Sequence, residues 1–517
     1  MNDAKSALVL TVVLVLLPNR IARPAEQAVG VVFHDANENG IREPDEQGIP
    51  GVHVSNGRTI VKTDEDGRYR LPTDDEMVLF ITKPSGWMTP VNENNLPRFY
   101  YIHNPEGSPK LKFKGIDPTG PLPDSVDFPL HRHNEPDKFR VVVFGDTQTY
   151  TMREVFYASH DLIPELVGVE AAFGVTLGDI VGDDLALFEP LTQAIGLIGL
   201  PWYNVKGNHD ANYDARPDHH LSSATFTRVF GPVYYAFDYS NVHFVVLNNP
   251  YYGQDKGYSA KLDEKQLEWL RQDLEMVPAE RLVVLMMHIP LPSMDDAEQI
   301  YRLLEQHPHA LSLSAHRHVA MQFFLTGEDG WKGEKPHHHI VAGTACGAWY
   351  RGMPDELGIP HGLMRDGVPK GYYVLTFDGN TYSARFKASR RPADYQMNIY
   401  APDAVESAHA HETEVLVNVF AGSEKSRTQM RLGPDGEWVE MEIVHAPDPN
   451  YVRQRAFESE LKPQSWKPMR EPRELPQIFL WRATLPANPP LGAQLIQVRT
   501  TDIYGQTYVA NRVIYIE

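Results

Sequence analysis

The sequence predicts an α/β protein whose central layered domain lies between two β-rich domains. Apolar runs of strand length recur from Phe139 to about residue 390, with helical segments between several of them. The stretches on either side have the alternation and turn residues of β-sandwiches. Because 517 residues are too many for one hydrophobic core, several domains are expected. We assign residues 1–28 to a signal peptide, 29–136 to an N-terminal β-sandwich, 137–391 to the central domain and 392–517 to a C-terminal β-sandwich.

The first residues have the pattern of an export signal. Lys5 precedes the apolar run Ala7–Leu17, which Pro18 ends. This run is too short to span a bilayer, but it suits the hydrophobic region of a signal peptide; a buried helix is the alternative. We therefore expect an exported protein, periplasmic or extracellular, whose mature chain has no transmembrane anchor.

Composition excludes several other classes. The formal charge of −20 argues against a general nucleic-acid or anionic-membrane binder, which needs a basic face. Cys346 is the single cysteine, so an internal disulfide, a CxxC redox site and a multi-cysteine zinc site are excluded. Nothing in the sequence indicates the oligomeric state.

A loop near the N-terminus, Asp35 to Glu46, matches the ligand spacing of calcium-binding loops. Its flanks, 29–33 and 49–54, read as strands rather than as the helices of an EF-hand. With residues 63–71 the segment resembles the calcium-binding B-type repeats of bacterial surface adhesins and related transthyretin-like sandwiches. A polar turn that binds nothing is the alternative. The predicted ligands of a structural calcium ion are Asp35, Asn37, Asn39, Ile41 and Glu46.

The central domain has continuous rather than alternating apolar runs, which indicates strands covered on both faces. A hairpin is expected around Ser240-Asn241. A helix is expected to begin at Asp263, with Gln266 as its capping-box partner. The expected strands are Val141–Phe144, Phe173–Leu177, Trp202–Val205, His243–Leu247, Leu282–Met287 and Leu311–Ser314.

The remaining stretch returns to a β pattern. Residues 438–443 alternate between apolar and polar, and 453–476 form a charged, proline-bearing excursion between strands. A small β-sandwich fits this pattern best. Upstream, His337-His338-His339 invites a metal interpretation, but neighbouring residues on a strand point to opposite faces. We interpret these histidines as the entry from a loop into a strand.

Polar side chains follow five of the central strands where each strand ends. Because reactive groups collect at the carboxyl ends of strands in open α/β sheets, these side chains are expected to meet. Two divalent cations about 3.5–4 Å apart need a bridging carboxylate with further oxygen and imidazole ligands. Carboxylate and imidazole suit Mn, Fe and Zn. The residues are Asp146, Gln148, Asp179, Asp183, Asn208, His209, His288, His316 and His318.

The order of these residues resembles the signature of the calcineurin-like metallophosphoesterases: D-x-H, G-D-x-x-(G)-D, G-N-H-D/E, H and G-H-x-H. The match spans residues 139 to about 390. It implies a four-layer α/β/β/α core, and the β-rich flanks are similar to exported bacterial members with an accessory domain on each side. Two positions depart from the signature: Gln148 stands where histidine is usual, and Ala315 where glycine is usual.

The resemblance implies a role for each residue. A hydroxide bridging the two metals would attack phosphorus in line, His209 would donate the proton to the leaving oxygen, and Asp183 would orient a ligand or His209. Asp179 would bridge the two metals. The first metal would be held by Asp146, Gln148, Asp179 and His318, and the second by Asp179, Asn208, His288 and His316.

Substrate contacts are expected from the segment 343–351, which follows the next strand. Trp349, Tyr350 and Arg351, together with Arg317, are the predicted pocket wall, and ordinary packing is the alternative. The predicted function is an exported binuclear phosphoesterase acting on phosphodiester or phospho-headgroup substrates, small or derived from the cell envelope. The alternatives are a phosphomonoesterase with the same site, and a surface binding protein whose central domain is a scaffold.

Overall fold

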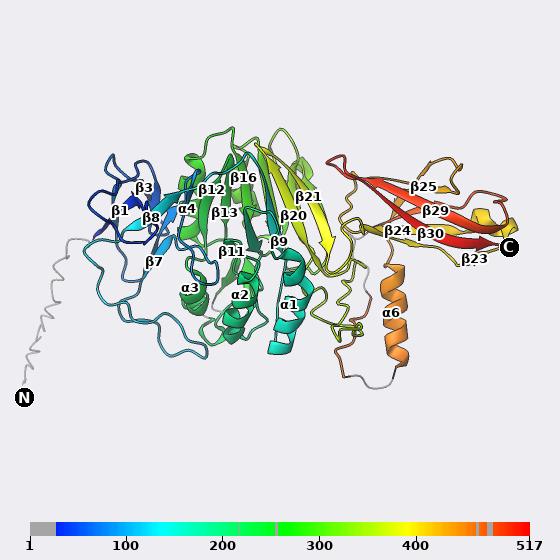
Figure 1. Ribbon diagram of the computed structural model, residues 1–517, viewed down its shortest axis with the longest axis horizontal. Helices are drawn as coiled ribbons and strands as arrows, with labels where there is room; N and C mark the ends of the chain where they lie inside the picture. The colour runs from blue at the N-terminus through cyan, green and yellow to red at the C-terminus, as the bar shows by residue number, and fades with distance from the viewer. Residues whose placement is uncertain (1–26, 217, 254–256, 462–464, 473–478) are drawn as a thin grey trace, which may run out of the picture.

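Three parts of the chain follow one another along the long axis of the computed structural model, with the N-terminal strands at one end and the C-terminal strands at the other (Figure 1). The expected signal peptide lies outside the described residues, except for Gln27 and Ala28. These two residues already belong to the first strand, where Ala28 pairs with Leu71 and is buried. The structure describes residues 27–216, 218–253, 257–461, 465–472 and 479–517.

The N-terminal part consists of two four-stranded sheets, ordered β4-β1-β8-β6 and β3-β2-β5-β7. The loop from Asp35 to Glu46 leaves β1 and leads to β2, so strands lie on both sides of it, as predicted; β2 begins at His53, however, later than the predicted flank of 49–54. The strands are β1 Gln27–His34, β2 His53–Ser55, β3 Ile60–Lys62, β4 Arg68–Pro72, β5 Met77–Thr82, β6 Trp87–Met88, β7 Tyr100–His103 and β8 Phe128–Arg132.

The central part contains two larger sheets, a five-stranded one ordered β11-β10-β9-β20-β21 and a six-stranded one ordered β12-β13-β16-β17-β19-β18. A short pair, β14 and β15, lies beside them. The strands are β9 Lys138–Phe144, β10 Phe173–Thr176, β11 Trp202–Asn204, β12 Tyr235–Tyr239, β13 Val242–Val246, β14 Pro250–Tyr252, β15 Tyr258–Ala260, β16 Leu282–Met286, β17 Ala310–Ser314, β18 Met321–Leu325, β19 His337–Val341, β20 Gly371–Asp378 and β21 Thr381–Ala388. The helices are α1 Met152–Leu166, α2 Phe188–Gly196, α3 Ala224–Phe230, α4 Glu264–Glu275 and α5 Ala297–Leu304.

Alternation along β9 shows how these layers pack. Val142 and Phe144 belong to a hydrophobic cluster with α1 and α2, whereas Val141 and Val143 belong to the cluster that fills the space between the two sheets. The outer face of the six-stranded sheet packs against α4 and α5 through residues such as Trp269. Both sheets are therefore covered on both faces, which explains the continuous apolar runs. The predicted α/β/β/α core is confirmed.

Local details follow the sequence closely, with one difference at α4. The hairpin of β12 and β13 turns at Ser240-Asn241, as predicted. Asp263 caps α4 by accepting a hydrogen bond from the Gln266 amide. The Gln266 side chain does not close the capping box, however, because it binds both the amide and the carbonyl of Asn248. The start of α4 is thereby attached to the end of β13.

The three consecutive histidines form the entry from a loop into a strand, as predicted, because they are the first residues of the buried strand β19. His337 and His339 share one face, where both contact the hydroxyl of Ser312. His338 points to the other face and contacts Tyr382 and Gln322. The expected alternation is confirmed, and all three imidazoles have hydrogen-bond partners within the fold.

The C-terminal part is a sandwich of two sheets, ordered β22-β24-β28-β27 and β23-β30-β29-β25-β26. Residues 438–443, expected as one strand, divide at Met441 between β26 and β27, which join different sheets. The excursion before β28 begins with α6, which stands beside the central part (Figure 1). None of the described helices is both long and apolar enough to cross a bilayer. The elements are β22 Met397–Tyr400, β23 Ala404–Val405, β24 Glu414–Val419, β25 Arg427–Leu432, β26 Val439–Glu440, β27 Glu442–Val444, α6 Pro449–Glu460, β28 Leu480–Thr484, β29 Gly492–Thr501 and β30 Thr507–Ile516.

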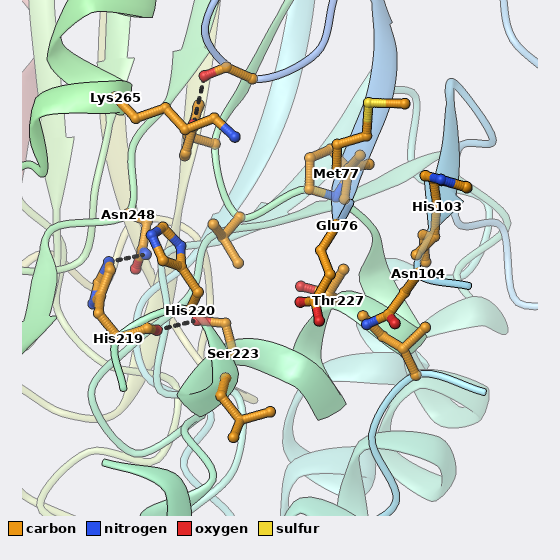
Figure 2. Close-up of a pocket in the computed structure, with 18 of the residues that line it drawn as sticks. Glu76, Met77, His103, Asn104, His219, His220, Ser223, Thr227, Asn248 and Lys265 are labelled. Carbon is orange, nitrogen blue, oxygen red and sulfur yellow. Dashed lines mark hydrogen bonds between the residues drawn. The ribbon is translucent and has the colours of Figure 1, made fainter. Parts of the chain in front are cut away.

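The N-terminal and central parts share one continuous hydrophobic cluster, in which Phe80 packs edge-on against Trp269. A cavity of about 500 Å³ lies at this junction (Figure 2). Met77 and His103 line it from the N-terminal part and His219 from the central part. None of the predicted metal ligands lines this cavity.

A buried ionic group connects the second sheet to α4. His243 on β13 lies 2.7 Å from Asp238 and 2.8 Å from Asp273, and His243 and Asp273 are almost inaccessible. Burial opposes the charged imidazole, but Asp273 and Asp238 outweigh it and raise the pKa of His243 to about 10. A protonated His243 therefore stabilises the fold fully below its unfolded pKa of about 6.5, and this contribution disappears as pH rises through 10.

Replacing this imidazole leaves Asp273 buried without its partner. We expect His243→Gln to lower the stability of the fold by about 3–5 kcal/mol at pH 6, and the deficit to narrow as pH approaches 10. Thermal unfolding of the wild type and the variant from pH 6 to pH 10 measures this deficit in stability. The matched control is His409→Gln, at an exposed imidazole. A deficit that does not depend on pH would contradict the role assigned to the charge.

Candidate metal centre

All nine side chains predicted at strand ends lie in one region. They follow β9, β10 and β11 of the five-stranded sheet and β16 and β17 of the six-stranded sheet. The carboxyl edges of two sheets, rather than one, therefore supply the centre. The parallel pairing of β9 with β10 and of β16 with β17 brings their ends to the same edge within each sheet.

One group of ligand atoms surrounds the imidazole of His288. Its Nε2 lies 3.2 Å from Asp179 Oδ2, 3.1 Å from Asn208 Oδ1 and 3.1 Å from His316 Nδ1. The other ring nitrogen, Nδ1, faces the carbonyl of Leu177 at 2.9 Å and donates to it. A neutral His288 therefore directs the lone pair of Nε2 at other acceptors. Acceptors that face one another in this way need a positive charge between them. Asp179, His288 and His316 each offer one ligand atom within 4.8 Å of the others.

A second group lies on the other side of Asp179. Asp146 Oδ1 and Gln148 Oε1 are buried and have no hydrogen-bond partner. His318 Nε2 is 3.6 Å from Asp146 Oδ1, and its Nδ1 donates to the carbonyl of Gly347 at 2.6 Å. Gln148 also lies beside Asp179, with its amide nitrogen 3.4 Å from Oδ2. Buried acceptors without donors fit a second cation, and Asp179 lies between the two groups.

The pKa values in this region follow from burial and from the charge of Asp179. Burial raises the pKa of Asp146 to about 7 and lowers those of His316 and His318 to about 3. For His288 the carboxylate of Asp179 outweighs burial and raises the pKa to about 9. In the metal-free protein, one proton on His288 therefore supplies part of the positive charge that Asp179 requires.

Backbone strain is concentrated around these residues. Twelve non-glycine residues of the described chain have a positive φ, a conformation that costs about 1–3 kcal/mol when it is unfavourable. Ala315 is not among them, so its replacement of the usual glycine has no conformational cost. The seven that belong to this region are Gln148, Asp179, Asp183, His316, His318, Trp349 and Tyr350.

The loop after β11 approaches the loop after β10 closely because Gly207 has no side chain. A Cβ there would lie 2.0 Å from the Asp179 amide nitrogen. Asp210 then joins the loops, because its carboxylate accepts hydrogen bonds from the amides of Gly207, Ile180 and Val181. The sequence did not single out Asp210, although it ends the same tetrapeptide as Asn208 and His209. Its role is to hold these two ligand-bearing loops together.

His209 is the predicted proton donor, and its ring is oriented by two neighbours. Asp183 Oδ1 lies 2.6 Å from His209 Nδ1, and the Tyr213 hydroxyl lies 3.2 Å from the same nitrogen. The backbone amide of His209 donates to Asp179 Oδ1 at 2.8 Å. Burial opposes protonation of His209, but the bond to Asp183 and the nearby carboxylates outweigh it and raise its pKa. Asp183 and Tyr213 therefore both hold the His209 ring at Nδ1.

The predicted substrate segment divides into residues that face the centre and residues that do not. Trp349 stacks on His318, with ring centroids 3.9 Å apart. Tyr350 is buried in the cluster beneath α1 and contacts Tyr157, so its expected place in a substrate pocket is wrong. Arg351 donates to the carbonyl of Pro468 in the C-terminal excursion, whereas Arg317 donates to Ser293.

In the predicted calcium loop, the side-chain oxygens are turned toward the loop's own amides. Asp35 is buried and accepts from the amides of Asn39 and Gly40. Glu46 accepts from the amides of Ala36 and Glu43. Of the remaining predicted ligands, Asn37 and Asn39 donate their side-chain amides to Glu43, and the Ile41 side chain is exposed.

Comparison with known proteins places this centre in one family. Three family models match the chain: "N terminal of Calcineurin-like phosphoesterase" at residues 36–116, "Calcineurin-like phosphoesterase" at 139–320, and "C terminal of Calcineurin-like phosphoesterase" at 339–508. A solved structure of a purple acid phosphatase from yellow lupin (Lupinus luteus) seeds is also similar. It has 14% identity and a TM-score of 0.38, over 65% of this chain and 67% of that one. No protein with a curated description matches.

Metal content tests the two groups of ligands. After loading with manganese and desalting, we expect about two metal ions per chain, and the loss of at least one in Asp179→Asn, because Asp179 lies between both groups. Elemental analysis measures this, and Asp124→Asn, at an exposed carboxylate, is the matched control. Fewer than about one ion in the wild type, or equal contents in both variants, would contradict the assignment.

Proposed function

Since the chain belongs to the calcineurin-like phosphoesterases, and is therefore a metal-dependent hydrolase of phosphoric esters, we propose that its centre is binuclear and cleaves phosphodiester or phospho-headgroup substrates. The observation that supports two cations is the pair of buried, unpaired acceptors on Asp146 and Gln148, beside the separate group around His288. Carboxylate, amide and imidazole ligands suit Mn, Fe or Zn.

The proposed ligand sets use all seven predicted metal ligands. One cation would be held by Asp146, Gln148, Asp179 and His318, and the other by Asp179, Asn208, His288 and His316. When bound, the cations would lower the pKa of water and neutralise charge on the phosphate oxygens. The hydrogen bonds of His288 to Leu177 and of His318 to Gly347 fix which ring nitrogen faces the centre.

His209 is proposed as the general acid for the leaving oxygen. Its Nδ1 is bonded to Asp183, so Nε2 is the ring nitrogen available to pass on a proton. Its backbone bond to Asp179 keeps the residue next to the proposed bridging carboxylate. No protein nucleophile is needed in this scheme, because water attacks the phosphorus directly.

Export and calcium binding are further parts of the proposal. The apolar run Ala7–Leu17 supports export and removal of a leader. Expression in a bacterial host tests both: the protein should be recovered from the periplasm, and its mass should be that of a shortened chain. The match of Asp35 to Glu46 with calcium-loop spacing supports a structural calcium ion.

Turnover of chromogenic esters tests the chemistry. We expect His209→Ala to lower kcat for bis(p-nitrophenyl) phosphate by about 10²–10⁴ and Asp183→Asn by about 10–100, with metal content retained. His160→Ala, at an exposed imidazole of α1, is the matched control. Unchanged turnover in both variants would refute the role of His209. Faster turnover of p-nitrophenyl phosphate than of the diester would assign the monoesterase alternative.

Added calcium tests the N-terminal loop. We expect calcium to raise the unfolding temperature of the manganese-loaded wild type, because a ligand that binds only the folded state stabilises it. Asp35→Asn should abolish this shift, whereas Asp45→Asn, at an exposed position of the same loop that is not a predicted ligand, should retain it. The same shift in all three proteins, or none in the wild type, would show that the loop is only a turn.

A further inference from the structure

Three arginines lie near Trp349 at the edge of the metal centre: one packs on its ring, and two line the same cavity. Arg317 lies between the predicted ligands His316 and His318, in the loop that follows β17. Arg365 lies in the long segment between β19 and β20. Arg470 comes from the C-terminal excursion after α6. We name these three residues the arginine rim. They are far apart in sequence and are brought together only by the fold.

The indole of Trp349 connects the rim to the centre. One side of the ring stacks on His318 at 3.9 Å, with 25° between the ring planes. The guanidinium carbon of Arg470 lies 3.6 Å from the centroid of the same indole. The cation of Arg470 is thus held next to an aromatic ring that itself contacts a predicted metal ligand, a favourable cation–π geometry.

A cavity of about 410 Å³ opens at the same place. Arg317, Arg365, His318 and Trp349 all line it, with apolar side chains such as Phe323 on the remaining wall. Because the predicted ligand His318 lines this cavity, a group attached to a phosphate at the centre can extend into a space whose wall carries the guanidinium groups of Arg317 and Arg365, with Arg470 behind the Trp349 ring. Cavities with apolar walls and a few converging polar groups are the usual form of ligand sites.

The charges of the rim are not neutralised within the described protein. No carboxylate oxygen of the described residues lies within 4 Å of the guanidinium nitrogens of Arg317, Arg365 or Arg470, although the chain has a net charge of −20. Two neighbouring cations of the excursion region do have partners, Arg455 with Glu471 and Lys467 with Glu154. Like charges held together without counter-charges favour the binding of an anion.

The position of Arg470 is fixed by contacts between the C-terminal excursion and the central part. Glu458 of α6 accepts hydrogen bonds from the amides of Met353 and Met469. The Gly352 amide donates to the carbonyl of Lys467 at 2.9 Å. The Tyr451 hydroxyl donates to the carbonyl of Arg470 itself. The backbone at Arg470 and just before it is therefore anchored, and the guanidinium is held on the Trp349 ring.

We propose that the arginine rim binds a second phosphate group of the substrate, so that the preferred substrate carries one phosphate at the metal centre and another at the rim. This inference rests on the proposed function of the centre. A phosphate dianion suits the rim because guanidinium groups bind its oxygens through paired, charge-assisted hydrogen bonds. The C-terminal part thereby supplies a specificity residue to a reaction carried out by the central part.

Two synthetic esters with one leaving group test the proposal. Ethyl p-nitrophenyl phosphate and 2-phosphoethyl p-nitrophenyl phosphate differ only in the second phosphate. We expect the wild type to have a kcat/KM for the 2-phosphoethyl ester at least about tenfold above that for the ethyl ester, and Arg365→Ala and Arg470→Ala each to lower this ratio by about fivefold or more. Arg453→Ala removes an arginine of α6 that is bonded to Asn450, does not line this cavity and, unlike Arg470, does not pack on Trp349; it should leave the ratio unchanged.

Binding without turnover separates this proposal from the function on which it rests. Calorimetry on the manganese-loaded protein should show tighter binding of ethane-1,2-diphosphonate than of ethylphosphonate, and Arg470→Ala should reduce the difference. If the protein binds the diphosphonate more tightly but hydrolyses neither ester, the proposed function is overturned and the second-phosphate site is not. Hydrolysis of both esters with a ratio near one, or with a ratio that the rim variants do not change, would overturn the second-phosphate site.

Discussion

The centre depends on one electrostatic requirement, the positive charge that Asp179 and its neighbours need. Asp179 Oδ2, Asn208 Oδ1 and His288 Nε2 converge on one another as acceptors. The Nδ1 proton of His288 cannot help there, because it is donated to the Leu177 carbonyl on the other side of the ring. Such an arrangement is unstable unless a cation or a proton lies inside it. Cations bound there would remove the need for a second proton, on His288 Nε2. Metal binding and protonation of this ligand therefore oppose each other.

The fold holds these acceptors together at a cost in backbone conformation. Asp179, His316 and His318 all adopt positive φ values, which side-chain-bearing residues rarely do. Rigid sheet edges make this possible, since each ligand lies within a few residues of a paired strand. Gly207 and Asp210 complete the support, the first by allowing close approach and the second by bonding three amides. Strain at the ligands is therefore balanced by packing and hydrogen bonding directly behind them.

The sequence predicted the layers and the strand ends because both depend on residue type at short range. Continuous apolar runs mark strands covered on both faces, and ligand-type residues directly after them can be read without knowing the fold. Tyr350 was assigned wrongly because the positive φ values of Trp349 and Tyr350 turn the chain, so that one ring meets His318 and the other enters the core. Arg470 could not be found because its contact with Trp349 joins segments more than a hundred residues apart, and no local pattern records such a contact.

This long-range contact separates chemistry from specificity within one chain. The predicted metal ligands come from the central part and are held by its two sheets. The rim, by contrast, is completed by residues 465–472, which are anchored through Glu458 and the carbonyls of Lys467 and Pro468. A change in this excursion is therefore expected to alter which substrate binds. In the proposed site, the excursion that starts with α6 supplies the one rim cation that the central part lacks, and α6 and the central part together hold it in position.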